Sequence, residues 1–243
     1  MSVSRKILEE KSNQELEKYI EPGNRFVPEA NLYAYEILKN KALLFINGKP
    51  PKKIPNLSDY ELIACTDGAF HYLKKLGFPF GKLDFISGDF DSHTGNDENI
   101  DEEKFIFTPD QDKTDFHKAL EILIEKNIEN IDVYGASGGE QDHFLGNLST
   151  AFFFKEKLNL KFFDEFSSYY FIPKDFSITN VKGKIISLLP FPIAKNIETE
   201  GLKWALCNEN LILGERIGTR NIAENSKISI KYKEGDLLIF VGN

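Results

Sequence analysis

Two aspartates stand one residue apart at the end of an apolar run, in the stretch LDFISGDFDS at residues 83–92. In an extended segment alternate side chains point the same way, so Asp89 and Asp91 are expected to share a face. Two carboxylates that close raise each other's pKa unless a cation offsets their charge. Mg²⁺ prefers carboxylate oxygens together with water and substrate phosphates. The pair therefore predicts a magnesium site, with a solvated turn as the plainer alternative.

A second acidic segment, DQDKTD, occupies residues 110–115 after the next apolar run. Asp112 and Asp115 are three residues apart, where a helical pattern begins. Taken alone, they fit a helix start, with Asp112 as the N-cap and Asp115 in the first turn. Together with Asp89 and Asp91 at one edge of a sheet, they favour a metal site.

A glycine-rich loop, GASGGEQDH, fills residues 135–143 and leads into another helical pattern. The backbone N–H groups of such a loop can bind phosphate, which makes Gly138 and Gly139 candidate contacts. The same letters fit an ordinary turn, in which Asp142 caps the helix and His143 lies on the surface. The proximity of the loop to the aspartates favours the phosphate interpretation.

The elements that must position these residues alternate between apolar runs and helical patterns. Runs that are apolar on both faces indicate strands of a parallel sheet, and the helical spacing between them indicates an α/β domain with right-handed crossovers. In such sheets ligands bind at the carboxyl edge of the strands. The expected strands lie within residues 42–48, 61–69, 83–92, 104–112 and 130–139, with a sixth at 160–165.

Beyond about residue 167 the helical spacing gives way to alternation between turn signals, which is typical of an antiparallel sandwich or barrel. We therefore expect an α/β protein: a mostly parallel, Rossmann-like N-terminal sheet with flanking helices, followed by a C-terminal antiparallel β-sandwich. The expected parts are a polar N-terminal extension (1–35), an α/β catalytic domain (36–167) and a β-sandwich domain (168–243). One or two short helices are expected in the extension.

Composition excludes several classes of function. The chain has 243 residues and a net charge of −8, which argues against a nucleic-acid partner. It contains no run approaching the roughly 20 apolar residues of a membrane span, and no signal-like N-terminus. Cys65 and Cys207 are the two cysteines and are expected to be buried thiols in a reducing compartment. A cytoplasmic protein with no membrane or nucleic-acid partner is expected.

The motifs TDGA, GDFDS, DQDKTDFHKAL and GASGGEQDH, in this order and spacing, resemble the thiamine pyrophosphokinase family. The later stretch EGLKWALCNENLILG resembles the C-terminal segment of that family. The resemblance implies magnesium-dependent transfer of pyrophosphate from ATP to the thiamine hydroxyl, giving thiamine diphosphate and AMP. It also implies a homodimer, with thiamine bound at the subunit interface between the α/β domain of one chain and the β domain of the other.

Carried over to matching positions, the resemblance assigns each candidate residue a role. Asp89, Asp91 and Asp115 would hold magnesium, with Asp112 nearby as a further catalytic residue. The ATP side would comprise Asp67, Gly68, Gly88, Ser92, Gly138, Gly139, Asp142 and His143. The thiamine side would comprise Gln111, Thr114, Asp115, Trp204, Arg220 and Asn221. Asp115 and Asp67 are both candidates to accept the hydroxyl proton.

This chain departs from the family pattern in two places. Many bacterial relatives carry arginine where this chain has Glu140, so a strong phosphate donor is missing. Arg220 is a hypothetical replacement. A Ser-Asn pair usual in the thiamine segment is Arg220-Asn221 here. Trp204 is expected either in the core of the β domain or as an aromatic wall for a flat ligand.

Two other functions fit part of the pattern. A DxD motif after a strand also begins haloacid-dehalogenase-type magnesium phosphohydrolases, in which the first aspartate is the nucleophile. The downstream residues of that pattern are not found in this chain. A non-catalytic nucleotide- or thiamine-binding protein is the other alternative, which Glu140 makes plausible. A dinucleotide-binding module is disfavoured because no GxGxxG follows the first strand.

Overall fold

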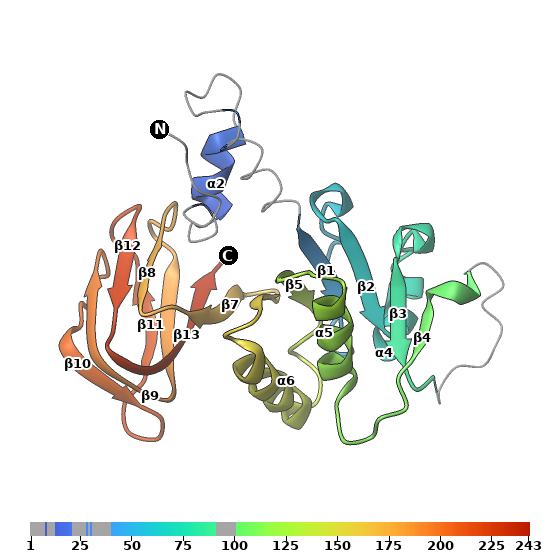
Figure 1. Cartoon of the computed structure of the whole chain (residues 1–243). Coiled ribbons are helices and arrows are strands. Elements are labelled where there is room, and N and C mark those ends of the chain that lie inside the picture. The colour runs from blue at the N-terminus through green and yellow to red at the C-terminus, as the bar shows by residue number, and fades with distance from the viewer. Residues whose placement is uncertain (1–7, 9–12, 21–27, 29, 31–39, 91–100) are drawn as a thin grey trace. The chain divides into compact units, whose positions relative to one another are not determined.

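The computed structural model describes residues 8, 13–20, 28, 30, 40–90 and 101–243 of the chain. These residues fall into two compact units, which are described separately (Figure 1). Unit 1 comprises Met1–Asn47 and Lys53–Asp132, and unit 2 comprises Gly48–Lys52 and Val133–Asn243. Asp91 and Ser92, which were predicted to contact magnesium and ATP, lie outside the described residues.

Unit 1 is built on a parallel sheet whose strands lie in the order β4-β3-β2-β1. Its strands are β1 (Lys41–Phe45), β2 (Leu62–Thr66), β3 (Phe85–Gly88) and β4 (Phe105–Phe107). Its helices and 3₁₀ turns are α2 (Asn13–Ile20), η1 (Leu57–Asp59), α4 (Asp67–Lys75), η2 (Phe80–Lys82), η3 (Glu102–Lys104) and α5 (Asp115–Glu125). Strands β1 to β3 are almost wholly buried, as expected for parallel strands covered on both faces.

The register of this sheet brings three strand ends to one edge. Thr66 pairs with Ser87, and Gly88 pairs with Phe107, so β2, β3 and β4 end level with one another. The segments that begin at Asp67, Asp89 and Thr108 therefore leave the sheet together. This is the carboxyl edge at which ligands bind in parallel sheets.

Helices α4 and α5 both pack against β2 and β3. In α5 the buried residues Phe116, Ala119, Leu120 and Leu123 recur at helical spacing and form one apolar face. The helix stops at Lys126, and Asn127 follows with φ of 60°, a left-handed conformation that commonly ends helices.

Unit 2 contains one long helix and an antiparallel sheet. Strand β5 (Asn130–Tyr134) crosses the division between the units, and α6 (Gln141–Phe154) follows it. The remaining strands are β6 (Asn159–Phe163), β7 (Ser167–Ile172), β8 (Asp175–Ile178), β9 (Ile185–Glu200), β10 (Cys207–Ile212), β11 (Gly218–Ile222), β12 (Ile228–Lys231) and β13 (Glu234–Gly242).

The long strand β9 organises this antiparallel region, because β10, β11, β12 and β13 all pair with it. Ile186, Leu188, Ile197, Leu237 and Ile239 are among the buried residues of its core. The pairing continues from β13 to β7 and from β7 to β6. The predicted α/β class with a C-terminal antiparallel β region is confirmed, and the sixth predicted strand corresponds to β6.

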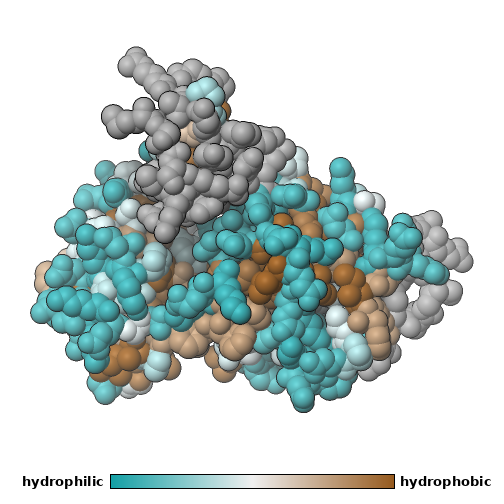
Figure 2. Space-filling view, in the orientation of Figure 1, coloured by the Kyte–Doolittle hydropathy of each residue, from teal (hydrophilic) through white to brown (hydrophobic). Residues whose placement is uncertain are grey.

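The exposure of residues tests the predictions about membrane spans and buried cysteines. Hydrophilic residues cover much of the face shown in Figure 2, with apolar areas between them. Within the described part of the chain, no helix is both long and apolar enough to cross a lipid bilayer. Cys65 is buried as expected, but Cys207 is exposed, so its prediction as a buried thiol is wrong. Cys207 begins β10, whose first two residues are both exposed and in which only Leu211 is buried.

Candidate functional site

Three carboxylates lie close together at the carboxyl edge of unit 1: Asp67, Asp89 and Asp115. Asp67 begins α4 directly after β2, and Asp115 begins α5. The pKa of Asp67 is raised, first by partial burial and then by the nearby charges of Asp115 and Asp89. We call this group, together with Gln111 and Asp112, the acidic edge.

Backbone N–H groups fix the orientation of Asp67. Its Oδ1 accepts from Gly68 N at 2.6 Å, and its Oδ2 accepts from Phe90 N at 3.2 Å. These bonds favour the charged carboxylate and partly offset the effects that raise its pKa. Asp67 thus joins the end of β2 to the turn after β3.

Gly88 makes room for this carboxylate. A Cβ at Gly88 would stand 2.3 Å from Cγ and 2.4 Å from Oδ2 of Asp67, closer than any side chain tolerates. Phe90 has φ of 55°, so the segment after β3 is not extended. The expectation that Asp89 and Asp91 share a face stays a prediction, because Asp91 lies outside the described residues.

The DQDKTD segment folds into two consecutive turns rather than starting the helix at Asp112. Asp112 N donates to Asp110 Oδ1 at 2.9 Å. The N-cap of α5 is Thr114, whose hydroxyl accepts from His117 N at 3.2 Å. The prediction of Asp112 as N-cap is therefore wrong, since threonine two residues later takes that position. Gln111 Nε2 donates to Asp89 Oδ2 at 3.2 Å and ties this segment to β3.

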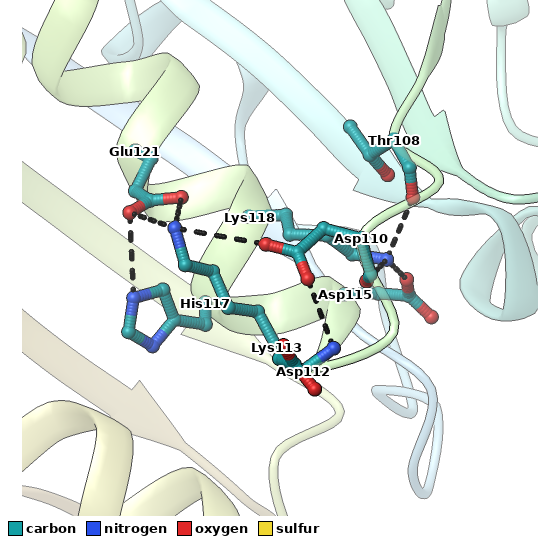
Figure 3. Close-up of polar contacts among 8 residues, drawn as sticks. All are labelled: Thr108, Asp110, Asp112, Lys113, Asp115, His117, Lys118 and Glu121. Atoms are coloured by element: carbon teal, nitrogen blue, oxygen red, sulfur yellow. Dashed lines mark hydrogen bonds and ion pairs between the residues drawn. The ribbon is translucent and has the colours of Figure 1, made fainter.

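The ammonium of Lys118 bonds to two backbone carbonyls and one carboxylate in and beside the acidic segment (Figure 3). Its ammonium lies 2.8 Å from Asp115 Oδ1 and donates to the carbonyl oxygens of Thr108 at 2.8 Å and Asp110 at 3.2 Å. Its side chain is only 6% exposed, whereas that of Asp115 is 39% exposed. Asp115 thus has one oxygen held by the protein while part of its carboxylate faces solvent.

The donor set of the acidic edge fits a hard divalent cation. Its carboxylate and amide oxygens are of the type that Mg²⁺ selects. Burial, and then repulsion from Asp115 and Asp89, raises the pKa of Asp67. A bound cation would relieve this repulsion. Asp67 interacts electrostatically with Asp115 and Asp89 at this edge. Among the described residues, ligand atoms that all lie within 4.8 Å of one another are found instead on the exposed side chains of Glu140, Asp142 and His143.

The glycine-rich loop belongs to unit 2, where the segment after β1 packs closely against it. Lys49 N donates to Ser137 O at 2.9 Å. A Cβ at Gly48 would stand 2.2 Å from Gly135 O, and one at Gly138 would stand 2.7 Å from Lys49 Cβ. Gly138 also has φ of 76°. Glycine is therefore required here for close approach and for a left-handed backbone.

The residues that follow the loop do not cap α6 as expected. Glu140 occupies the N-cap position without a side-chain hydrogen bond, and Asp142 lies in the first turn. The prediction of Asp142 as the cap is wrong, because its Oδ1 accepts from the neighbouring His143 N instead. His143 is exposed, as its plainer interpretation predicts, and its Nε2 lies 3.5 Å from Glu140.

A lysine beside the glycine-rich loop was missed by the sequence reasoning. Lys49 lies against Gly138, and its ammonium contacts Glu165 at 2.5 Å. Lys52 contacts the same carboxylate at 3.1 Å, so two lysines share one glutamate. Hydrogen bonds from Lys49 and Lys52, and then the charges of these two lysines, lower the pKa of Glu165. The signal in the sequence was the run GKPPKK at 48–53, directly after the first strand.

Trp204 and Asn221 form part of a pocket in unit 2, which we call the tryptophan pocket. Asn221 Oδ1 accepts from Trp204 N at 3.1 Å, and Asn221 Nδ2 donates to Trp204 O at 2.7 Å. Trp204 is 55% exposed, so the core alternative is wrong and the aromatic-wall alternative remains. The pocket has a volume of about 170 Å³ and is lined by Leu188, Trp204, Leu206, Leu211, Arg216, Ile217, Gly218, Thr219 and Asn221.

The predicted site residues thus form separate groups. Arg220 precedes Asn221 in β11, has φ of 58° and donates its backbone N–H to Ser187 Oγ at 2.9 Å. The predicted thiamine residues Gln111, Thr114 and Asp115 lie in unit 1 with the acidic edge, and Trp204, Arg220 and Asn221 lie in unit 2. Of the predicted ATP residues, Asp67, Gly68 and Gly88 lie in unit 1, and Gly138, Gly139, Asp142 and His143 lie in unit 2.

Comparison with known proteins assigns most of the chain to one family. Residues 55–162 match the family model described as "Thiamin pyrophosphokinase, catalytic domain", and residues 171–237 match "Thiamin pyrophosphokinase, vitamin B1 binding domain". Thiamine pyrophosphokinase 1 of Oryza sativa subsp. japonica is 30% identical, over 81% of this chain and 85% of the relative. Thiamine pyrophosphokinase of Bacillus subtilis is 26% identical, over 82% of this chain and 97% of the relative.

Solved structures share the fold. Thiamin pyrophosphokinase family protein from Enterococcus faecalis matches with a TM-score of 0.72 at 20% identity, covering 84% of this chain and 99% of that one. Yeast thiamin pyrophosphokinase matches with a TM-score of 0.70 at 17% identity, covering 86% and 89%. The chain therefore belongs to the thiamine pyrophosphokinase family, and the enzyme class expected from its motifs, thiamine diphosphokinase, is confirmed.

Proposed function

We propose that this chain transfers the pyrophosphoryl group of ATP to the hydroxyl of thiamine, giving thiamine diphosphate and AMP, with Mg²⁺ as the metal. The observation that supports this most strongly is the convergence of Asp67, Asp89 and Asp115 at the carboxyl edge of a parallel sheet. Phosphoryl-type transfer depends mainly on positioning and on stabilising charge at the phosphate oxygens. A rigid acidic edge with its carboxylates held by backbone and lysine provides such positioning.

In this proposal Asp89, Asp91 and Asp115 hold the metal, with Asp112 nearby. When bound, Mg²⁺ would neutralise charge on the phosphate oxygens. Gln111 restrains Asp89 through its side-chain amide, and Lys118 restrains Asp115. These restraints hold the metal-binding carboxylates in place before substrate binds. Neighbouring groups that orient metal ligands in this way strengthen metal binding.

The attacking hydroxyl must lose a proton, and a carboxylate is the natural acceptor. Asp67 and Asp115 are the two candidates. Asp67 is half-buried and fixed by two backbone N–H groups, whereas Asp115 is bound by an ammonium. Conversion of each to asparagine, followed by measurement of kcat against pH, distinguishes the acceptor from the group that only binds metal.

The ATP phosphates are proposed to lie along Gly68, Gly88, Ser92, Gly138 and Gly139, with Asp142 and His143 beside them. Glu140 contributes no positive charge here, so another cation must meet the phosphates. Arg220 was one hypothesis. Lys49 is a second candidate, because its side chain lies against Gly138 of the glycine-rich loop.

Thiamine is proposed to bind against Trp204, Arg220 and Asn221 from one subunit, and against Gln111, Thr114 and Asp115 of the other, in a homodimer. An exposed tryptophan whose backbone exchanges two hydrogen bonds with one asparagine suits a flat cationic ligand. The proposed division assigns 36–167 to catalysis and 168–243 to thiamine binding, after an extension at 1–35. A cytoplasmic location accords with the sparse cysteines.

The test is to incubate the purified chain with ATP, Mg²⁺ and thiamine and to quantify AMP and thiamine diphosphate. Equal amounts of the two products are expected. Free phosphate without thiamine diphosphate would favour the phosphohydrolase alternative. Binding of ATP and thiamine without any turnover would favour the non-catalytic alternative, which Glu140 suggests.

A further inference from the structure

Lys118 is a charged residue in a position where charge is costly. Its side chain is 6% exposed, although it does not share the apolar face that Phe116, Ala119, Leu120 and Leu123 form on α5. A buried ammonium is tolerated only when it is paired and hydrogen-bonded. A lysine whose ammonium faced solvent would avoid this desolvation cost. The burial of Lys118 therefore needs a structural reason.

The contacts of Lys118 match its bonding capacity. A lysine ammonium has three donor hydrogens and no acceptor. Its three partners are Thr108 O at 2.8 Å, Asp110 O at 3.2 Å and Asp115 Oδ1 at 2.8 Å (Figure 3). One residue thus joins the segment after β4 to the first turn of α5. The two backbone carbonyls anchor the segment, and the carboxylate fixes the side chain of Asp115.

We propose that Lys118 is a positioning residue that prepares Asp115 and the segment 108–112 to bind a divalent cation. The inference rests on the proposed role of the acidic edge. Through the carbonyls of Thr108 and Asp110, Lys118 also sets the position of Gln111, which bonds to Asp89. Both sides of the candidate metal site therefore depend on one buried ammonium.

A different result is expected if Lys118 only stabilises the fold. In that case, removal of its charge would lower the stability of the metal-free protein and leave the intrinsic affinity for Mg²⁺ unchanged. Partners that orient metal ligands instead change metal affinity, typically by about 10- to 100-fold when removed. Measurement of metal binding itself separates these two roles, whether or not the enzyme turns over.

The matched control is Lys113, five residues earlier. Its ammonium contacts Glu121 at 2.8 Å and Asp110 Oδ2 at 3.9 Å, and its side chain is 38% exposed. Lys113 contacts neither Asp115 nor the anchored carbonyls in the described structure (Figure 3). Lys113→Gln removes the same charge from the same region and loses the contacts with Glu121 and Asp110 Oδ2, but it leaves the three contacts of Lys118 in place.

The experiment compares the parent chain with Lys118→Gln, Lys118→Arg and Lys113→Gln. Glutamine keeps an amide that can donate to the carbonyls, but it loses the ion pair with Asp115. The dissociation constant for Mg²⁺ alone is measured by calorimetry, and the melting temperature Tm is measured without metal. We expect Lys118→Gln to raise the Mg²⁺ dissociation constant by about 10-fold or more. Lys113→Gln should leave it at the parental value.

Lys118→Arg should fall between the parent and Lys118→Gln, because it keeps the charge but replaces a compact ammonium with a planar fork. If Lys118→Gln does not fold, the arginine variant carries the test, and its Mg²⁺ dissociation constant must still exceed that of the parent. An unchanged or lowered constant in the folded Lys118 variants would overturn the proposal, as would an equal loss in Lys113→Gln. Failure of the parent to make AMP would count against the proposed reaction, while the Mg²⁺ titrations would still decide the role of Lys118.

Discussion

The acidic edge and the tryptophan pocket are built by different means. At the acidic edge, Asp67 and Asp115 are fixed by backbone N–H groups and by the buried Lys118, at the level ends of parallel strands. In the tryptophan pocket, the main group is an exposed aromatic ring held through its backbone by Asn221. β11, which carries Asn221, is irregularly paired with β9 between Gly218 and Asn221.

The difference between these two regions indicates that they serve different functions. A fixed cluster of like charges raises the free energy of the empty site and suits metal-dependent chemistry. An exposed ring over a small pocket contributes contact area and adds little charge. We therefore expect changes at the acidic edge to act on turnover or metal affinity, and changes in the tryptophan pocket to act on thiamine affinity.

The largest expected effect comes from Asp115→Asn at the acidic edge. The substitution removes one metal-binding charge and the ion pair of Lys118. Because Thr114 still caps α5 and Lys118 keeps its carbonyl acceptors on Thr108 and Asp110, the chain should fold with a lowered Tm. Loss of several kcal/mol of transition-state stabilisation corresponds to a fall in kcat of at least about 100-fold. Glu121→Gln, on the same helix, is the control and should keep near-parental kcat. A similar fall in both variants would argue against a special role for the acidic edge.

The second prediction concerns packing beneath the acidic edge. Gly88→Ala would place Cβ 2.3 Å from Asp67 Cγ and should lower the free energy of unfolding by about 1–3 kcal/mol.

Gly146 offers the opposite case in unit 2, because it lies within α6 and a Cβ there meets no atom within 4 Å. Gly146→Ala should therefore raise the free energy of unfolding by roughly 0.5–1 kcal/mol. Urea titration measures both, and equal signs would contradict this account.

The third prediction addresses the tryptophan pocket. Trp204→Ala should raise the KM for thiamine by about 10-fold, since an aromatic contact contributes roughly 1 kcal/mol or more. Because Trp204 is 55% exposed, Tm should change little. Leu213→Ala, with an exposed fraction of 53%, is the control outside the pocket and should leave KM unchanged. A loss of kcat with unchanged KM in Trp204→Ala would remove the contrast between the two regions.

The smallest expected effect is at the lysine pair beside the glycine-rich loop. Lys49 and Lys52 lower the pKa of Glu165, so its ionised form stabilises the folded state above its ordinary pKa of 4.5. This contribution is lost as pH falls through the lowered pKa. Glu165→Gln should therefore melt slightly below the parent at neutral pH, and the difference should vanish in acid. A constant difference in Tm across the pH series would point to packing instead of charge.

The sequence was sufficient to predict the strands and the residues at their ends. Apolar runs identified β1 to β6, and the parallel pairing of β2, β3 and β4 brings the ends of these three strands to one edge. Local turn chemistry was harder to predict. Thr114 and Asp112 are both good N-cap residues, and only the fold decides which one caps α5. The left-handed Phe90 was also unexpected, because a phenylalanine seldom adopts that conformation.

Roles that depend on distant contacts could not be derived from the sequence. Lys118 appears in the sequence as one polar residue of an amphipathic helix, and its burial follows from carbonyls eight and ten residues away. Lys49 reaches Glu165 across 116 residues of sequence. Gly88 was assigned to the ATP side, but the contact that requires glycine there is with Asp67, at the end of a neighbouring strand. Such requirements arise from packing between elements, which sequence spacing does not reveal.

The most direct test of the central claim is the formation of AMP from ATP and thiamine by the parent chain and by Asp89→Asn, each titrated with Mg²⁺. The account predicts that the parent forms AMP and thiamine diphosphate in equal amounts, and only when a divalent cation is present. It predicts that Asp89→Asn, folded to the same Tm, loses at least about 100-fold in turnover at saturating Mg²⁺. Near-parental AMP formation by Asp89→Asn would show that the acidic edge is not the catalytic centre.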